Sequence, residues 1–482
     1  MESNTNSYPY SWESNVKYQD LMDLIQPYPD HHIEKTIEHK LMCRVILKRS
    51  SGSKLYFFTV NVLGENLAES SLQIVVHNSV SSPEALETCK KITLGDVIGI
   101  VGYGGKTKVG ELSVFAVQVQ ILAPCIHDLP KEQYAPTDFD CRFRQRYLDL
   151  IMNPKARSNL IARSKVIGWI RNQLNSQDFL EVETPILNMN YGGANAKPFI
   201  THHNEYNRDM YMRIAPELYL KQLVIGGLCK IYELGKQFRN EGVDATHNPE
   251  FTSIEIYSSP ADYNTMFELC ENLISGVVKD ICGKTSISYK DTLLDFSSGF
   301  KRIDFLDELS SSLEYDLNSL DFFNKESLTT LENLIKSKGL ICPPPLTAPR
   351  MLDFLCGEFI EVNCIQPTFV CNHPRIMSPL AKPHRNCPWK TERFELFILG
   401  KEYANAYTEL NDPLIQKASF DAQSTDKASG DAEAQPPDMD FVKALEYGLP
   451  PTGGLGIGID RLVMLVTNEN SIREIISFPT MK

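Results

Sequence analysis

Short runs of β-branched, aliphatic and aromatic residues, each ended by turn residues, fill the chain from Leu41 to Leu122 and constrain its fold more than any other feature. Runs of this kind, bounded by Gly and Ser clusters, are typical of β-strands. So many strands in so short a segment favour a small barrel. The five runs are Met42–Leu47, Leu55–Val62, Leu72–Val76, Val97–Val101 and Leu112–Leu122.

The charge of this segment differs from that of the rest of the chain. The whole chain carries 48 Lys and Arg against 61 Asp and Glu, a net charge of −13, which by itself argues against a polyanionic partner. Between Ile37 and Pro124, however, nine basic residues face seven acidic ones, so this stretch is about +2 and the remainder about −15. The five-stranded oligonucleotide-binding (OB) barrel is the commonest small barrel that carries basic and aromatic side chains on its strands. We therefore expect an OB-type barrel that could meet nucleic acid.

Composition gives an expectation for the cell compartment. No uninterrupted apolar run approaches the length of a membrane-spanning helix, and the N-terminus lacks the basic and apolar regions of a signal peptide. The 12 cysteines are scattered without any CxxC spacing. We expect reduced thiols, no membrane partner and a cytoplasmic location.

Changes in composition along the chain divide it into three segments. Residues 1–36 are polar and without a sustained period, so they are expected to form an N-terminal arm, followed by the barrel domain at 37–130. A polar connector then leads to a larger, mixed domain at 142–482, which makes the fold class α+β. The acidic, proline-bearing stretch 424–440 is expected to be an exposed loop. Residues 311–345 are expected to be an insertion or a helical subdomain.

The first candidate site lies on two strands predicted at Ile231–Arg239 and Phe251–Tyr257, joined by a polar segment of hairpin-loop length. Because side chains alternate along a strand, an arginine, two acids and two aromatics converge on one face. A solvated sheet face with aromatics at its rim is the alternative. The residues of this face are Glu233, Gly235, Gln237 and Arg239 on the first strand, and Phe251, Ser253, Glu255 and Tyr257 on the second.

A second hairpin is predicted from Arg393 to Leu410, with its turn at Leu399–Lys401. Glu395 and Glu402 flank this turn and could hold a divalent cation whose remaining ligands come from phosphate. Glu402 has the opposite parity to Asn405, Tyr407 and Glu409, so a β-bulge is needed if all serve one site. Ordinary surface carboxylates are the alternative reading of the two acids.

The third candidate is the glycine-rich run Gly453–Gly458, followed by a helix that begins near Arg461. Glycine permits close backbone approach. The run is not a dinucleotide-binding fingerprint, because Arg461 stands where the last glycine would be.

Taken together and in this order, the three candidates resemble the class II lysyl-tRNA synthetases, from the barrel to Lys482. Phe179–Pro185 is similar to the first class motif, whose proline lies at the dimer interface in that family. Phe238–Phe251 is similar to the second motif and Gly456–Arg461 to the third. Further stretches like those of lysine-type members are Arg213–Leu218, Asn405–Asp412 and Glu446–Pro451.

The resemblance implies an antiparallel sheet flanked by helices, in which ATP activates L-lysine without a protein nucleophile. It implies that Arg239 clamps the lysine carboxylate and the α-phosphate, and that Arg461 neutralises the γ-phosphate and stacks on adenine opposite Phe251. Glu395 and Glu402 are expected to hold Mg²⁺. The residues expected at ATP are Arg239, Glu241, His247, Asn248, Phe251, Glu402 and Arg461, of which Arg239, Glu241 and Arg461 are the expected catalytic groups.

The resemblance also implies the contacts for lysine and for tRNA(Lys). Glu409 and Tyr257 correspond to the contacts of the side-chain ammonium group, and Glu217 and the backbone of Gly193 to those of the α-amino group. The complete expected lysine set is Gly193, Glu217, Glu255, Tyr257, Asn405, Tyr407 and Glu409. On the barrel, Phe57, Gln73 and Arg44 correspond to anticodon contacts, whereas Gln118 stands where relatives often have an acid.

Other functions compete with this one. An aspartate- or asparagine-type ligase of the same subclass would need a cation in its side-chain pocket, where this chain offers Glu409 and Tyr257. A non-catalytic RNA-binding protein would not need to keep together the four charged residues Arg239, Glu395, Glu402 and Arg461. A lysine ligase with a protein acceptor would lack the barrel. A homodimer is implied by the resemblance alone.

Overall fold

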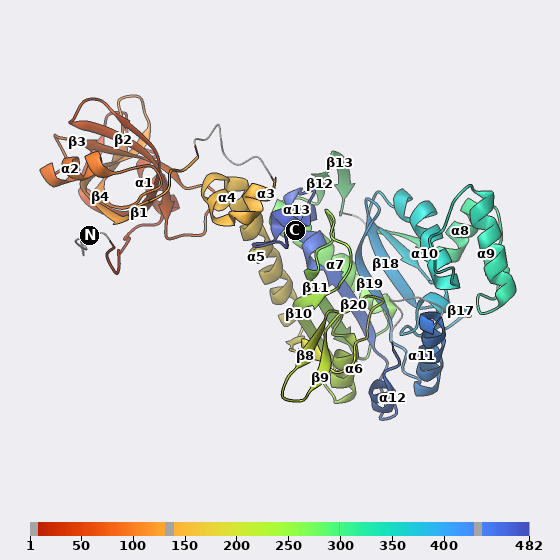
Figure 1. Cartoon of the computed structure of the whole chain (residues 1–482). Helices are drawn as coiled ribbons and strands as arrows, with labels where there is room; N and C mark the ends of the chain where they lie inside the picture. The colour runs from red at the N-terminus through yellow and green to blue at the C-terminus, as the bar shows by residue number, and fades with distance from the viewer. Residues whose placement is uncertain (1–7, 131–138, 298, 429–435, 482) are drawn as a thin grey trace. The chain divides into compact units, whose positions relative to one another are not determined.

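The computed structural model describes residues 8–130, 139–297, 299–428 and 436–481 (Figure 1). They form two compact units, whose boundary falls between Ile161 and Ala162. Helix α5 (Pro154–Asn175) runs through this boundary, so no turn signal marks it. The domain boundaries proposed at residues 36, 130 and 142 remain predictions.

The first unit contains the expected five-stranded barrel, closed in the order β1-β2-β3-β5-β4 (Figure 1). Along β2, Tyr56, Phe58, Val60 and Val62 are buried in the barrel core and alternate with half-buried outward residues. The OB-type barrel predicted from the strand runs is confirmed in its strand number and closure. Its strands are β1 (Ile33–Ser50), β2 (Leu55–Leu63), β3 (Ser71–His77), β4 (Val97–Lys106) and β5 (Leu112–Ala123), with α2 (Pro83–Lys91) between β3 and β4.

The segment predicted to be an extended arm differs from that expectation. It contains helix α1 (Tyr18–Ile25), whose Leu21 and Ile25 are fully buried in the barrel core. An eight-residue helix is too short to display a sustained period, so its two buried residues could not be recognised from spacing alone. Residues 1–7 of this segment lie outside the described part of the chain.

The second unit is built on an eight-stranded sheet of order β14-β15-β18-β19-β20-β11-β10-β6. The six strands from β15 to β10 are antiparallel, as expected, whereas the two edge pairs β14–β15 and β10–β6 are parallel. The strands are β6 (Leu180–Glu181), β10 (Lys230–Phe238), β11 (Glu250–Ser258), β14 (Lys301–Asp304), β15 (Thr368–Cys371), β18 (Arg393–Ile398), β19 (Lys401–Thr408) and β20 (Gly453–Gly458).

The two faces of this sheet have different roles. Helices α5, α7 (Tyr263–Cys282) and α13 (Ile459–Thr467) bury one face in the main hydrophobic core. On β11, Ile254 and Ile256 point into that core, so the odd-numbered residues between and around them point to the other face. On that side, α6 (Glu217–Ile225), α11 (Pro413–Ala428) and α12 (Met439–Leu445) share a smaller core.

A helical subdomain with its own hydrophobic core is formed by α8 (Phe305–Leu313), α9 (Lys325–Ser337) and α10 (Ala348–Phe359). This confirms the helical alternative for residues 311–345. The remaining elements are α3 (Phe139–Arg144), α4 (Arg146–Met152), α14 (Ile472–Ile475), β7 (Leu187–Asn188), β8 (Ile200–His203), β9 (Arg208–Met212), β12 (Ser286–Tyr289), β13 (Thr292–Asp295), β16 (Pro383–His384), β17 (Cys387–Thr391) and the short 3₁₀ turns Leu317–Ser319, Glu361–Asn363 and Arg375–Met377.

Within Phe179–Pro185, the stretch similar to the first class motif, only Leu180–Glu181 forms a strand. One local expectation needs correction. The stretch 424–440 is not a loop throughout, because α11 continues to Ala428 and α12 starts at Met439, while residues 429–435 lie outside the described chain. Among the described residues, no helix is long and apolar enough to span a membrane.

Candidate active site

A cavity of about 460 Å³ opens on the polar face of the large sheet. Every catalytic, lysine, nucleotide and metal residue expected from the sequence lines this one cavity. They are Gly193, Glu217, Arg239, Glu241, His247, Asn248, Phe251, Glu255, Tyr257, Glu395, Glu402, Asn405, Tyr407, Glu409 and Arg461. The structure therefore brings the expected set together in one cavity.

The two strands of the first predicted hairpin are confirmed, and the structure adds their register. Glu233 pairs with Glu255 and Gln237 with Phe251 across β10 and β11, which is compatible with the shared face that was expected. β20 adds a third strand, with Gly456 opposite Glu255. The polar residues reach the cavity because the alternate positions are held in the hydrophobic core.

The β-bulge that the second hairpin required is present. Leu399 and Gly400 form a two-residue turn with φ of 48° and 67°, the left-handed geometry of a tight hairpin. Leu396 pairs with Ala404 but Phe397 pairs with Glu402, so Tyr403 is the extra residue of β19. Tyr403 is buried in the hydrophobic core. Glu402 consequently lines the cavity together with Asn405 despite their opposite parity.

Glu395 and Glu402 form an unequal carboxylate pair. Burial alone would raise the pKa of the Glu395 carboxyl. The Arg393 guanidinium and His373 outweigh this effect and lower the pKa to about 2. Arg393 Nη2 donates to Glu395 Oε1 at 2.5 Å, and His373 Nε2 lies 3.2 Å from Oε2. For Glu402, burial and the Glu395 charge both raise the pKa. One carboxylate is thus held ionised, and a nearby cation would favour the ionised form of the second.

This donor set fits a magnesium ion that is shared with a phosphate chain. No group of three or more His, Cys, Asp or Glu side chains among the described residues is arranged to hold a metal alone. Mg²⁺ is commonly held by only one or two carboxylates, with substrate phosphates and water as the other ligands. Glu395 and Glu402 satisfy that requirement.

Arg239 and Arg461, the two arginines expected at ATP, both line the cavity. The Arg239 guanidinium lies 5.0 Å from the centroid of the Phe251 ring. Arg461 Nη1 donates to the Glu402 carbonyl at 2.5 Å, and its Nη2 donates to His247 Nε2 at 3.2 Å. His247 Nδ1 in turn donates to Asp244 at 2.9 Å. These contacts orient Arg461 before any ligand arrives.

Buried polar atoms without a hydrogen-bond partner gather around the same cavity. Within the described residues they include Nε of Arg239, both side-chain polar atoms of Gln237, Oδ1 of Asn248 and Oε1 of Glu409. Buried polar groups are nearly always satisfied, because an unmade hydrogen bond in the interior is destabilising. Such a concentration of unsatisfied donors and acceptors indicates a site for a polar, charged ligand.

The acidic end of the cavity contains Glu217, Glu255 and Glu409. Tyr407 Oη donates to Glu217 Oε1 at 2.5 Å, and Tyr257 Oη donates to Glu255 Oε2 at 3.0 Å. Burial, followed by the Glu217 charge, raises the pKa of Glu255 to about 8. Burial also raises the pKa of the Glu409 carboxyl, which is 1% exposed. In such an environment a cationic ligand stabilises the ionised form of the carboxylates.

Gly454 is required by the packing at this end. A Cβ on Gly454 would lie 2.0 Å from Glu409 Oε1 and 2.9 Å from Tyr257 Cε1. Any other residue would therefore displace the two groups expected to bind the substrate ammonium. Gly193, with φ of 85°, has the left-handed backbone that glycine adopts most readily.

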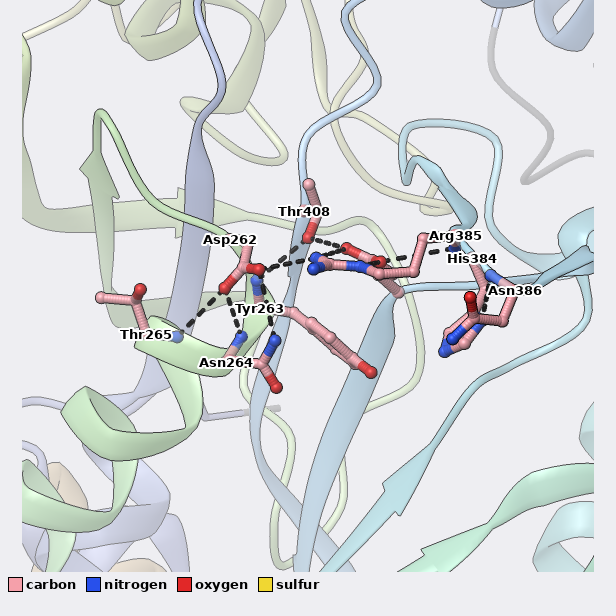
Figure 2. Close-up of polar contacts among 9 residues, drawn as sticks. Asp262, Tyr263, Asn264, Thr265, His384, Arg385, Asn386 and Thr408 are labelled. Atoms are coloured by element: carbon pink, nitrogen blue, oxygen red, sulfur yellow. Dashed lines mark hydrogen bonds and ion pairs between the residues drawn. The ribbon is translucent and has the colours of Figure 1, made fainter.

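A polar cluster beside the cavity anchors the end of β19 (Figure 2). Thr408 Oγ1 accepts from the Tyr263 backbone N–H at 3.0 Å and donates to Glu392 at 2.6 Å. Arg385 pairs with Glu392 and with Asp262, whose carboxylate caps the first turn of α7. The cluster thereby fixes the strand end that presents Tyr407 and Glu409. The sequence analysis missed it because its members come from segments far apart in the chain.

The expected anticodon residues lie on strands of the barrel in the first unit, at positions that alternate with residues of the barrel core. In the strand register, Arg44 lies opposite Asn61, and Gln73 lies opposite Thr59. Asn61 and Thr59 share the outward face of β2 with Phe57. Arg44 Nη1 donates to the Gly95 carbonyl at 2.8 Å.

Gln73 is buried, whereas Gln118 on β5 is exposed. The register therefore brings Arg44, Phe57 and Gln73 to one face, while their contacts with RNA remain a prediction.

Comparison with known proteins agrees with the class suggested by the motifs. The family model "tRNA synthetases class II (D, K and N)" matches residues 138–482. The chain is 46% identical to the lysine–tRNA ligase cla4 of Cladosporium cladosporioides, over 99% of this chain and 82% of the relative. It is 46% identical to a probable cytoplasmic lysine–tRNA ligase of Enterocytozoon bieneusi, over 99% and 93% respectively. It is also 41% identical to a lysine–tRNA ligase of Oceanobacillus iheyensis, over 100% and 96%. The chain belongs to the class II tRNA synthetases of the D, K and N group.

Proposed function

We propose that this protein is a lysine–tRNA ligase, which activates L-lysine with ATP to lysyl-adenylate and transfers the lysyl group to the 3′ end of tRNA(Lys). The proposal depends on one observation above all. Among the described residues, Arg239 Nε and Glu409 Oε1 have no hydrogen-bond partner. Both side chains line the same cavity, so an anion and an ammonium group can be bound there together. Lysine offers both groups, and ATP supplies the phosphate.

The chemistry at the nucleotide end consists of positioning and charge neutralisation. The lysine carboxylate attacks the α-phosphate in line, and pyrophosphate leaves. Arg239 binds the carboxylate and the α-phosphate, while Arg461, oriented by His247, neutralises the γ-phosphate. Glu241 and Asn248 line the nucleotide, and Phe251 stacks on the base. Magnesium held by Glu395 and Glu402 would supply further positive charge to the phosphates.

Selection of lysine occurs at the acidic end. Glu409 and Tyr257 receive the side-chain ammonium group, and Glu217 with the backbone of Gly193 receives the α-amino group. Glu255, Asn405 and Tyr407 support these contacts. An aspartate or asparagine side chain would bring a carboxylate or an amide to three buried acids, which is unfavourable.

The tRNA is bound through the barrel, on the face that carries Arg44, Phe57 and Gln73. We also propose a cytoplasmic homodimer. The dimer is supported by large apolar side chains left exposed between residues 180 and 200, next to the expected dimer motif. They are Leu180, Ile186, Leu187, Met189 and Ile200. Exposed apolar groups that cluster in this way are typical of protein interfaces.

The direct test is ATP–pyrophosphate exchange with each of the twenty amino acids in turn. Lysine alone should support rapid exchange, and lysylation of a tRNA(Lys) transcript should follow. Exchange with aspartate or asparagine instead of lysine would show that the protein is an aspartate- or asparagine-type ligase. The absence of exchange with any amino acid would favour a non-catalytic RNA-binding protein, and exchange without tRNA charging would favour another acceptor.

A further inference from the structure

Lys221 is a fully buried lysine inside the acidic end of the cavity wall, and the sequence analysis did not single it out. Its side chain is 0% exposed. Its Nζ lies 2.6 Å from Glu217 Oε1 and forms a second ion pair with Glu409 Oε2. One internal ammonium group thus joins the carboxylate expected to bind the α-amino group to the carboxylate expected to bind the side chain.

The contacts of Lys221 leave one oxygen of each carboxylate for a ligand. Glu409 Oε1 has no hydrogen-bond partner in the described chain. At Glu217, Lys221 and Tyr407 both bind Oε1, and the described residues provide no hydrogen bond to Oε2. The lysine therefore fixes the two carboxylates relative to each other without filling either one.

The charges at this end support a role in selection. In the free site, burial and the Glu217 charge raise the pKa of Glu255 to about 8. Two bound ammonium groups favour its ionised form, and Glu217, Glu255 and Glu409 then carry three negative charges, which Lys221 reduces to a net two. The negative charge of the adjacent Glu233 is already neutralised by its ion pair with Arg213. A net charge of two negatives matches a ligand with two ammonium groups, which a diamino acid has after its carboxylate has gone to Arg239. A single ammonium group would leave one buried carboxylate uncompensated, which is strongly unfavourable.

We propose that Lys221 is a specificity-determining positioning residue, whose ammonium group bridges Glu217 and Glu409 and so sets both the spacing and the net charge that select a diamino acid of the length of lysine. This inference rests on the proposed function and deepens it. Lys221 does not touch the reacting atoms and acts through the two carboxylates. Ornithine, one methylene shorter, cannot span two subsites held at the lysine spacing.

The surroundings of Lys221 explain why a cation is tolerated there. Its Nζ lies 5.4 Å from the centroid of the Tyr407 ring and 5.8 Å from that of Phe441. Aromatic faces stabilise a desolvated cation. The acidic and phenolic groups that face this ammonium or its carboxylate partners are Glu217 on α6, Glu255 and Tyr257 on β11, and Tyr407 and Glu409 at the end of β19.

The test replaces Lys221 by an uncharged side chain of similar length, Lys221→Met, with Lys221→Gln and Lys221→Arg as companions. The matched control is Lys236→Met, because Lys236 is partly exposed, pairs with Glu250 and does not line the cavity. Kinetic constants for lysine, ornithine and ATP are measured by pyrophosphate exchange on the full chain. Folding of each variant is checked by circular dichroism and thermal unfolding.

We expect Lys221→Met to raise the KM for lysine by about 100-fold, since one partner of a buried ion pair is lost. The KM for ATP should change less than about threefold. The ratio of kcat/KM for lysine over ornithine should fall by at least about tenfold, which is within the range that one methylene contributes to discrimination. Lys221→Arg, which keeps the charge, should recover part of this ratio, and Lys236→Met should leave every constant unchanged.

An unchanged lysine-to-ornithine ratio in a folded Lys221→Met or Lys221→Gln variant would overturn the inference, because a purely structural lysine would affect both substrates equally. Loss of folding in all three variants would also overturn it, since Lys221 would then be a structural ion pair. Failure of the proposed function is distinguished by the wild-type protein, which in that case shows no lysine-dependent exchange at all.

Discussion

Replacement of Glu409 by glutamine provides the sharpest test of where the substrate ammonium binds. Glu409 is 1% exposed and pairs with Lys221 through Oε2. Its Oε1, which has no hydrogen-bond partner in the described part of the chain, points toward Gly454 at the cavity wall. Glutamine has nearly the same shape and keeps one acceptor, but it removes the charge. The mutation should therefore weaken lysine binding without altering the packing around Gly454.

The expected size of the effect follows from burial. Breaking a buried charge pair by removing one partner costs about 3–5 kcal/mol. The retained amide oxygen favours the lower value, and about 3 kcal/mol corresponds to roughly a 150-fold change at about 1.4 kcal/mol for each factor of ten. We expect the KM for lysine to rise by about this factor, while the KM for ATP stays within about threefold.

Lysine-dependent pyrophosphate exchange measures both constants in one assay, with Glu250→Gln as the control. Glu250 is an exposed carboxylate at the start of β11 and pairs with Lys236 outside the cavity. If Glu409→Gln raised the two KM values equally, or lowered only kcat, the ammonium could not be bound at Glu409. The assignment of the acidic end to the lysine side chain would then be wrong.

Three further predictions concern other parts of the protein. Gly454→Ala should raise the KM for lysine at least about tenfold in the exchange assay, because the new Cβ would lie 2.0 Å from Glu409 Oε1; an unchanged KM would contradict the proposed ammonium subsite. Phe57→Ala should raise the KM for tRNA in aminoacylation by about tenfold and leave exchange without tRNA unaffected, since a stacked base contributes about 1–3 kcal/mol; equal loss in both assays would instead indicate damage to the fold. For Glu255, burial and then the Glu217 charge raise the pKa from 4.5 to about 8, so the folded state binds this proton more tightly than the unfolded chain does. The resulting stabilisation is complete below about pH 4.5 and is lost as pH rises to 8, so thermal unfolding curves of Glu255→Gln should depend less on pH over this range than those of the wild type. Parallel pH profiles would show that Glu255 is not the group responsible.

Local sequence patterns were enough to predict the elements that carry the cavity residues. Strand periodicity placed Glu255 and Tyr257 on one face and Ile254 and Ile256 on the other, and β11 has that arrangement. Parity along the second hairpin required a bulge, which Tyr403 provides. Such features could be predicted because they depend on neighbours within a few residues, where backbone geometry leaves few alternatives.

Some features of the first unit and of the region around the cavity could not be predicted in the same way. Helix α1 is held by the burial of Leu21 and Ile25 in the barrel core. Its eight residues make too few helical turns for the spacing of apolar residues to reveal the helix. Arg385 binds both Glu392 and Asp262, and Asp262 lies 123 residues away from it in the sequence. Only folding brings these partners together, so no local pattern indicates them.

Lys221 illustrates the division most clearly. Read along the chain, it is a lysine four residues after a glutamate on a helix, which is the ordinary spacing of a solvent-exposed ion pair. The tertiary structure covers that helix face with β19 and α12, so the same pair becomes fully buried and acquires Glu409 as a second partner. The sequence determined which charged groups the chain carries and on which element each lies. The tertiary structure decided which of them are removed from water and placed against each other, because burial and long-range charge pairing depend on segments that meet only in the folded chain.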